Sequence, residues 1–389
     1  MDAIGFLAIF ILASGFGHGL ILRWAIRVFP SVARHQRRAV IVIGLLILAT
    51  PIARLFARTD ASAVSSSLLA AGMIEVMIVL VAAIPIFLLG AAASVVPSAP
   101  PHVAAKAKDE PIVGRREAIE RVGGIAMLGV SGAALGWGMA RGRHAFEIEE
   151  VVVKVVGLPR ALDGYTIAQV SDLHVGLFVG ERELREGLSR LAEIKPDLVV
   201  ATGDLVDIDP HFAPLMARAL GSLKARDGVA AILGNHDYYT GARKVLAALR
   251  AAGVNTLVNS GIHLRKGDGC GFALLGVDDL SAEHSGGEGP SLDTAMAMVP
   301  PDAPRILLAH QPRFFRDAKG LVALQLSGHT HGGQINPGFR PADFFMEFVS
   351  GRYEAAGSTL WVNRGFGVAG PPSRVGAAPE VTKIVLVSA

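Results

Sequence analysis

Long apolar stretches dominate the first third of the chain and restrict its fold more than any other feature. A helix that crosses a lipid bilayer needs about 20 apolar residues. Four stretches approach or exceed that length, at about residues 4–22, 39–56, 68–95 and 122–140. From about residue 146 the composition becomes that of an ordinary globular domain. We therefore predict an all-α membrane region of about four transmembrane helices in residues 1–145 and a separate domain in residues 146–389.

The basic residues between the apolar stretches predict how the chain is oriented in the membrane. Five arginines lie between the first and second stretches, and five basic residues lie between the third and fourth. Positively charged loops stay on the cytoplasmic side, so residues 146–389 are expected outside the cytoplasm. The opposite orientation stays open as an alternative and is favoured by Arg54, Arg58, Arg141 and Arg143.

A paired arginine precedes the fourth apolar stretch. Arg115 and Arg116 resemble the start of a twin-arginine export signal. The alternative is that their charge simply holds this helix end on the cytoplasmic side. Both interpretations predict the same topology.

Charge and cysteine content exclude several classes of protein. Residues 1–145 contain 14 Lys/Arg and 7 Asp/Glu, whereas residues 146–389 contain 23 and 27. The second part is thus slightly acidic, which does not suggest a nucleic-acid-binding surface. Cys270 is the single cysteine. One cysteine alone cannot form an intrachain disulfide or a thiolate metal cluster.

The second part of the chain has the pattern of an α/β domain. Short β-branched runs such as "YTIAQV" and "DLVVAT" alternate with segments of helical spacing such as "REGLSRLAEI". Polar residues repeatedly follow the buried runs. Because ligands of open α/β sheets gather at the carboxyl ends of strands, we expect these polar residues to form a site.

Five motifs contribute those polar residues. In chain order they are "SDLH" with Asp172 and His174, "GDLVD" with Asp204 and Asp207, "GNHD" with Asn235, His236 and Asp237, "LAHQ" with His310, and "SGHTHGG" with His329 and His331. Alternate residues of an extended segment point the same way, so His329 and His331 could reach one metal ion or two neighbouring ions. Carboxylate, amide and imidazole ligands without sulfur suit hard-to-borderline divalent cations.

These motifs, in this order over residues 165–333, resemble the calcineurin-like metallophosphoesterases. The spellings "GYTIAQVSDLHVG" and "GHTHGGQ" are similar to a membrane-associated or exported bacterial branch, and the likeness extends over about residues 149–387. The resemblance implies a four-layer α/β/β/α sandwich. It also implies that Asp172, His174 and His331 bind one metal, that Asn235, His310 and His329 bind a second, and that Asp204 bridges them. In that family, the position of His236 protonates the leaving group or stabilises the phosphoryl charge.

Two divalent cations about 3.5–4 Å apart can stabilise an in-line displacement at phosphorus and activate a water molecule. We therefore expect a hydrolase that cleaves a phosphoester with metal-activated hydroxide, using Mn²⁺, Fe, Zn²⁺ or Co²⁺. His236 favours a phosphodiester over a monoester, because an alkoxide leaving group needs a proton. The membrane region favours a substrate in the bilayer or the cell envelope, such as a lipid or an envelope polymer.

Two alternative functions stay open. One is a cytoplasm-facing pyrophosphatase of a nucleotide-linked lipid precursor. The other is a catalytically silent metal-binding sensor module.

Some residues near the motifs have less specific expectations. Asp207 and Asp237 are expected to orient histidines or to cap turns. Arg364 and Arg374 are either ligands of a distal phosphate or ordinary surface arginines. Gly332 and Gly333 are expected to leave room for the substrate.

Overall fold

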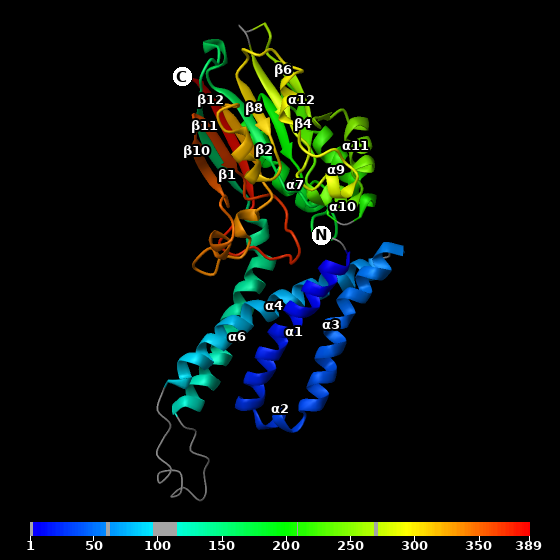
Figure 1. Cartoon of the computed structure of the whole chain (residues 1–389), viewed down its shortest axis with the longest axis vertical. Helices are drawn as coiled ribbons and strands as arrows, with labels where there is room; N and C mark the ends of the chain where they lie inside the picture. The colour runs from blue at the N-terminus through cyan, green and yellow to red at the C-terminus, as the bar shows by residue number, and fades with distance from the viewer. Residues whose placement is uncertain (1–2, 60–62, 96–114, 208, 268–270) are drawn as a thin grey trace, which may run out of the picture. The chain divides into compact units, whose positions relative to one another are not determined.

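The computed structural model describes residues 3–59, 63–95, 115–207, 209–267 and 271–389. Cys270 and the proline-rich segment at 96–114 lie outside the described residues. The chain divides into two compact units, Met1–Gly136 and Trp137–Ala389, and Figure 1 labels their elements.

The first unit is helical throughout its described residues. Its helices are α1 (Ala3–Val28), α2 (Pro30–Arg34), α3 (Gln36–Thr59), α4 (Ala63–Ser94) and α6 (Arg115–Ala140), the last of which continues into the second unit. Trp24 and Val28 of α1 are buried against Ala82 and Ile86 of α4. The indole nitrogen of Trp24 donates a hydrogen bond of 2.9 Å to the carbonyl oxygen of Glu120 in α6.

The four predicted membrane spans fall within α1, α3, α4 and α6. Among the described residues, two stretches are long and apolar enough to cross a membrane, Glu75–Ser94 and Arg115–His144. These correspond to the third and fourth predicted spans. A membrane crossing by α1 and α3 stays a prediction.

Two mixed six-stranded sheets form the framework of the second unit. The first has the strand order β1-β12-β2-β3-β4-β5 and the second β10-β11-β9-β8-β7-β6. The strands are β1 (Glu147–Val155), β2 (Tyr165–Val170), β3 (Leu198–Thr202), β4 (Val229–Ile232), β5 (Asn255–Thr256), β6 (Ser260–Leu264), β7 (Phe272–Gly276), β8 (Arg305–Leu308), β9 (Leu324–Ser327), β10 (Gly351–Ala355), β11 (Ser358–Val362) and β12 (Glu380–Ser388). The predicted α/β class is thus confirmed for this unit.

Alternating side chains explain how each sheet buries both of its faces. In β3, Leu198 and Val200 belong to the core between the sheets, whereas Val199 and Ala201 belong to the core beneath helices. The sequence of such a strand is a continuous apolar run, because both faces of the sheet are covered. The first sheet is covered by α7 (Glu181–Leu188), α8 (Arg190–Ile194), α9 (Ala213–Gly221) and α11 (Ala242–Ala251).

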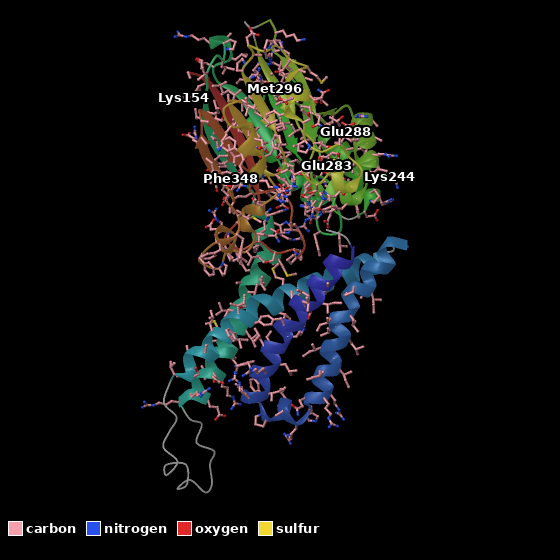
Figure 2. The ribbon with its side chains drawn as sticks, viewed as in Figure 1. Lys154, Lys244, Glu283, Glu288, Met296 and Phe348 are labelled. Carbon is pink, nitrogen blue, oxygen red and sulfur yellow. The ribbon has the colours of Figure 1, made fainter. Side chains whose placement is uncertain are left out.

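The second sheet is layered in the same way. Leu274 of β7 faces the core between the sheets, and Leu275 faces the outer core. That outer core includes α12 (Leu292–Met296) and the short α13 (Phe315–Ala318). Met296, labelled in Figure 2, packs against it from a partly buried position.

The parallel strands bring the functional motifs together. β2, β3 and β4 are parallel neighbours in one sheet, and β7, β8 and β9 are parallel neighbours in the other. The carboxyl ends of parallel strands meet at one edge. The loops that follow these strands carry the five polar motifs.

Candidate metal centre

The site is assembled from both sheets. Asp172 and His174 follow β2, and Asp204 follows β3. Asn235 and His236 begin the short helix α10 (Asn235–Thr240) directly after β4. From the second sheet, one histidine follows β8 and two follow β9, namely His310, His329 and His331.

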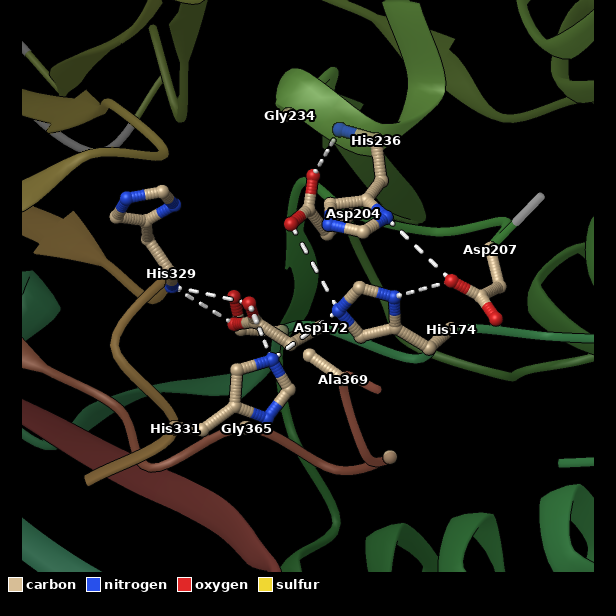
Figure 3. A network of polar contacts seen from close by, with 12 residues as sticks. Asp172, His174, Asp204, Asp207, Gly234, His236, His329, His331, Gly365 and Ala369 are labelled. Atoms are coloured by element: carbon tan, nitrogen blue, oxygen red, sulfur yellow. Dashed lines mark hydrogen bonds and ion pairs between the residues drawn. The ribbon is translucent and has the colours of Figure 1, made fainter. Parts of the chain in front are cut away.

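One group of potential ligands consists of Asp172, His174 and His331. One atom from each lies within 4.8 Å of the others, and all three residues are buried. The Nε2 atoms of His174 and His331 are 3.1 Å apart, and His331 Nε2 is 3.4 Å from Asp172 Oδ1. Figure 3 shows these side chains pointing toward one another.

A second group consists of Asp204, His310 and His329, again with one atom from each within 4.8 Å of the others. His310 Nε2 lies 3.2 Å from Asp204 Oδ2 and 3.2 Å from His329 Nδ1. The same Asp204 Oδ2 is 3.7 Å from Nε2 of His174, which belongs to the first group. Asp204 therefore lies between the two groups.

The chemistry of these residues fits divalent cations. The two groups present carboxylate oxygens and imidazole nitrogens, a donor set that suits borderline divalent metals. Among the described residues, no hydrogen-bond partner reaches the buried Oδ1 atom of Asn235. An orphaned amide oxygen beside a cluster of imidazoles is expected where a cation completes its coordination.

The backbone of the site is unusual because the potential ligands themselves have positive φ. The φ angles are 54° for Asp172, 46° for His174, 51° for Asp204, 75° for His329 and 52° for His331. Residues other than glycine rarely adopt this left-handed region, and doing so costs about 1 kcal/mol or more for each. Local strain is therefore concentrated where the ligand atoms converge.

Two glycines permit the close approach of the loops. A Cβ atom at Gly328 would lie 1.9 Å from Ser171 Oγ and 2.2 Å from Asp172 Oδ2. A Cβ atom at Gly234 would lie 2.2 Å from Asp204 Oδ1. Neither position can hold a larger residue without moving a potential ligand.

The expected role of Gly332 and Gly333 is wrong. A Cβ atom at Gly332 would meet the side chain of Arg364, and one at Gly333 would meet Oδ1 of Asn336. Both glycines have positive φ, of 59° and 83°. They turn the chain after His331 and do not form open space for a substrate.

The two flanking aspartates contact the site in different ways. Asp207 Oδ1 lies 3.6 Å from His174 Nδ1 and 3.4 Å from His236 Nδ1, so it faces the far side of both rings. The buried Asp237 accepts hydrogen bonds from the backbone amides of Leu205, Val206 and Gly234 at 2.9–3.2 Å and thereby joins two site loops.

The pKa values of the neighbouring residues His236 and Asp207 are shifted in opposite directions. Burial by itself would lower the pKa of His236, but the carboxylates of Asp204 and Asp207 outweigh it and raise the pKa to about 9. Burial would raise the pKa of Asp207, but its contacts with His174 and His236 lower it to about 2. In the metal-free chain, His236 and Asp207 thus form a charged pair at neutral pH.

The remaining shifts have related causes. Burial and the negative charge of Asp204 raise the pKa of Asp237 to about 6. Burial and the positive charge of His310 lower the pKa of His329 to about 4. His329 is therefore neutral at pH 7, which is the form of imidazole that binds metals.

The surroundings of Arg374 match neither of its two alternatives, a ligand of a distal phosphate or an ordinary surface arginine. Arg374 is buried, with 1% of its surface exposed, and it donates hydrogen bonds to the carbonyl oxygens of Gly365, Gly367 and Ala377. Its Nη2 atom lies 3.1 Å from Nδ1 of His331. It is thus neither a surface arginine nor a substrate ligand, and it supports a potential metal ligand from behind.

Arg364 is likewise occupied by protein groups. It pairs with Glu380 at 2.7 Å and with Glu147 at 3.0 Å.

One further polar contact, between Asp279 and Gln311, was not predicted from the sequence. The buried Asp279, after β7, accepts hydrogen bonds of 3.0 and 3.1 Å from the side-chain amide of Gln311. The signal in the sequence was the pair "DD", one residue after the strand "FALLG", at the same kind of position as the other motifs.

Comparison with known proteins agrees with this geometry. Residues 165–333 match the family model for the calcineurin-like phosphoesterases. The chain is 32% identical over 284 residues to the uncharacterized metallophosphoesterase YkuE of Bacillus subtilis, an alignment that covers 70% of this chain and 98% of that protein. It is 33% identical over 248 residues to an uncharacterized metallophosphoesterase of Aquifex aeolicus, covering 62% and 92%.

The same comparison finds larger animal proteins. The chain is 34% identical over 254 residues to a transmembrane protein with metallophosphoesterase domain from Bos taurus, covering 62% of this chain and 57% of that protein. A relative with the same name from Danio rerio is covered over 60% of its length. The chain thus spans less than two thirds of these two relatives.

The chain belongs to the calcineurin-like metallophosphoesterases. This family consists of phosphoesterases that bind divalent metals. The two groups described above, and a third formed by His174, Asp207 and His236, are the candidate sites for such metals among the described residues.

Proposed function

We propose that the chain is a two-metal phosphodiesterase that acts on a substrate in the membrane or the cell envelope. The observation that carries the proposal is the position of Asp204. One of its carboxylate oxygens lies 3.7 Å from a histidine of the first donor group and 3.2 Å from a histidine of the second. A carboxylate between two sets of imidazoles is suited to bridge two cations.

In this proposal each cation has its own set of ligands. Asp172, His174 and His331 would hold one cation, and Asn235, His310 and His329 would hold the other. Asp204 would contribute to both. When bound, such cations withdraw electrons from the phosphoryl group and make a water molecule a better nucleophile.

His236 would supply the proton that the leaving oxygen needs. Its Nδ1 atom faces Asp207 at 3.4 Å, and its backbone amide donates a hydrogen bond of 2.8 Å to Asp204 Oδ1. These contacts leave Nε2 to face the substrate, and 30% of the side chain is exposed. An alkoxide is a poor leaving group unless it is protonated, which favours a diester as the substrate.

The membrane assignment rests on three supports. Two stretches of helix are long and apolar enough to span a bilayer. Two of the relatives are named transmembrane proteins. The basic loops favour a catalytic unit outside the cytoplasm, and the orientation can be checked by the access of added protease to residues 146–389 in intact cells.

The reaction is tested with the full chain in detergent, loaded with Mn²⁺, on a chromogenic phosphodiester and the matching monoester. We expect metal-dependent cleavage of the diester, a loss of about 100-fold or more in kcat for His236→Ala, and loss of metal-dependent turnover for Asp204→Asn. His211→Ala is the matched control, because His211 is exposed and lies in none of the motifs. Cleavage of the monoester alone would contradict the diester assignment, and two bound metals without turnover would contradict an enzymatic function.

A further inference from the structure

A cavity extends from the metal centre toward an apolar loop. Its volume is about 490 Å³. Its lining includes Asn235 and His329, which are potential metal ligands. It also includes Phe345, Met346 and Phe348 of the apolar loop, together with Arg316 and Glu347, which form an ion pair. A molecule that fills the cavity would therefore contact potential metal ligands and apolar side chains at the same time.

The apolar loop, residues 336–350, exposes several large side chains. The exposed fractions are 59% for Phe339, 75% for Phe344, 88% for Phe345 and 44% for Met346. Consecutive aromatic rings along it are neighbours, with centroids 6.4 Å apart for Phe339 and Phe344 and 6.5 Å apart for Phe344 and Phe345. Clustered exposed apolar side chains of this kind mark interaction surfaces.

The backbone of the loop is nevertheless well anchored. Arg340 donates hydrogen bonds to Ser350 Oγ at 2.6 Å and to Asp343 at 2.7 Å. Phe348, labelled in Figure 2, packs edge-on against Tyr353 of β10 with ring centroids 5.0 Å apart. The exposed rings are thus held in place by polar contacts and by packing on the second sheet.

The loop is also connected, through residues 374–375, to the last turn of α6. The amide of Asn336 donates a hydrogen bond of 2.7 Å to the carbonyl oxygen of Val375, and the neighbouring amide of Arg374 donates one of 3.3 Å to the carbonyl oxygen of Gly138 in α6. Trp137, in the same last turn of α6, is 55% exposed. Within the second unit, the aromatic loop is therefore joined through 374–375 to the point where a candidate membrane helix ends.

We propose that this cavity binds the apolar chain of an amphiphilic phosphoester. Phe345 and Met346 of its lining would select for that chain, next to the exposed ring of Phe344, which neighbours Phe345. The inference rests on the proposed function, because the phosphate must lie at the metal centre. The potential metal ligands in the lining suit the phosphate, and Phe345, Met346 and Phe348 suit an alkyl or acyl chain. The substrate class is thus a lipid phosphoester reached at the bilayer surface.

The test measures binding of methyl-, butyl- and octylphosphonate to the metal-loaded full chain in nanodiscs. Each compound is used as an inhibitor of the soluble chromogenic diester and, independently of catalysis, as a ligand in calorimetry. The readout is the ratio between the binding constants of butylphosphonate and octylphosphonate, calculated separately for each protein. For the native chain we expect about tenfold tighter binding of the octyl compound, because its four further methylenes are partly buried.

The double variant Phe344→Ser, Phe345→Ser should reduce this ratio to about twofold or less. Met298→Ser is the matched control, since Met298 is 60% exposed and follows α12, before the start of β8; it should retain the native ratio. An equal ratio in all three proteins would show partition into the nanodisc only and would overturn the proposal, as would a ratio near one in the native chain. Absence of metal-dependent hydrolysis would contradict the proposed function alone, because the calorimetric ratio still reports on the cavity.

Discussion

The tight packing at Gly328 leads to a quantitative prediction for Gly328→Ala. The added Cβ atom would lie 1.9 Å from Ser171 Oγ and 2.2 Å from Asp172 Oδ2. Carbon and oxygen atoms ordinarily approach to about 3.3 Å, so the overlap exceeds 1 Å with both atoms. The amide of Gly328 also donates a hydrogen bond of 3.0 Å to the carbonyl oxygen of His310, which ties the glycine to the neighbouring loop.

Overpacking of this kind costs about 1–3 kcal/mol, and two simultaneous overlaps place Gly328→Ala near the upper end. Replacing glycine by alanine restricts the unfolded chain, which returns about 0.5 kcal/mol. The net loss in the free energy of unfolding is about 2.5 kcal/mol. For a unit of this size, that loss lowers the Tm by about 5–10 °C.

The assay is thermal unfolding of the full chain in detergent, once with Mn²⁺ and once with chelator. Gly267→Ala is the matched control, because a Cβ atom there meets nothing within 4 Å, and its Tm should stay within about 2 °C of the native value. Gly328→Ala should also show a smaller rise in Tm on adding metal, since the displaced carboxylate belongs to Asp172. A variant that melts like the native chain and responds equally to metal would refute the steric argument.

Three further predictions concern the metal centre. Removing metal with chelator should lower the Tm by about 5–11 °C, because a ligand present at 100 times its Kd stabilises the fold by about 2.7 kcal/mol. Thermal unfolding of the chelated and the Mn²⁺-restored protein measures the difference, and equal Tm values would contradict the prediction. Arg374→Met should weaken metal binding about 10–100-fold through loss of support for His331. The control Arg352→Met, at an exposed ion pair, should leave the affinity unchanged. Competition with a fluorescent chelator measures both affinities, and equal values for the two variants would rule out the supporting role. Asn235→Ala should remove one of two metal-binding steps in calorimetry, and two unchanged steps would exclude Asn235 as a ligand.

The potential ligands were predictable because their positions follow from simple rules. Each lies directly after an apolar strand, and parallel strands place such residues at one edge. Asp204 and His310 come from different sheets, yet the same rule applies to both. The α/β class followed from the alternation of buried runs and helical segments.

Other features depend on contacts that no local pattern records. Arg374 reaches His331 across 43 residues of sequence, and the intervening turn has no periodicity that would predict its direction. The aromatic residues at 339–348 alternate with charged residues in no regular period, and their exposure is visible only after folding. The glycines at 332 and 333 were assigned the wrong role, because a positive φ and open space favour the same residue type.

Five potential ligands of the second unit have a left-handed backbone conformation, which lowers stability at the positions that carry the metal-binding groups. Glycine at His174 or His331 would relieve about 1 kcal/mol or more of local strain while discarding an imidazole. Selection for metal binding should therefore keep histidine at those positions despite the strain. The residues that the proposed hydrolysis needs are then held in a backbone conformation that stability alone would not favour.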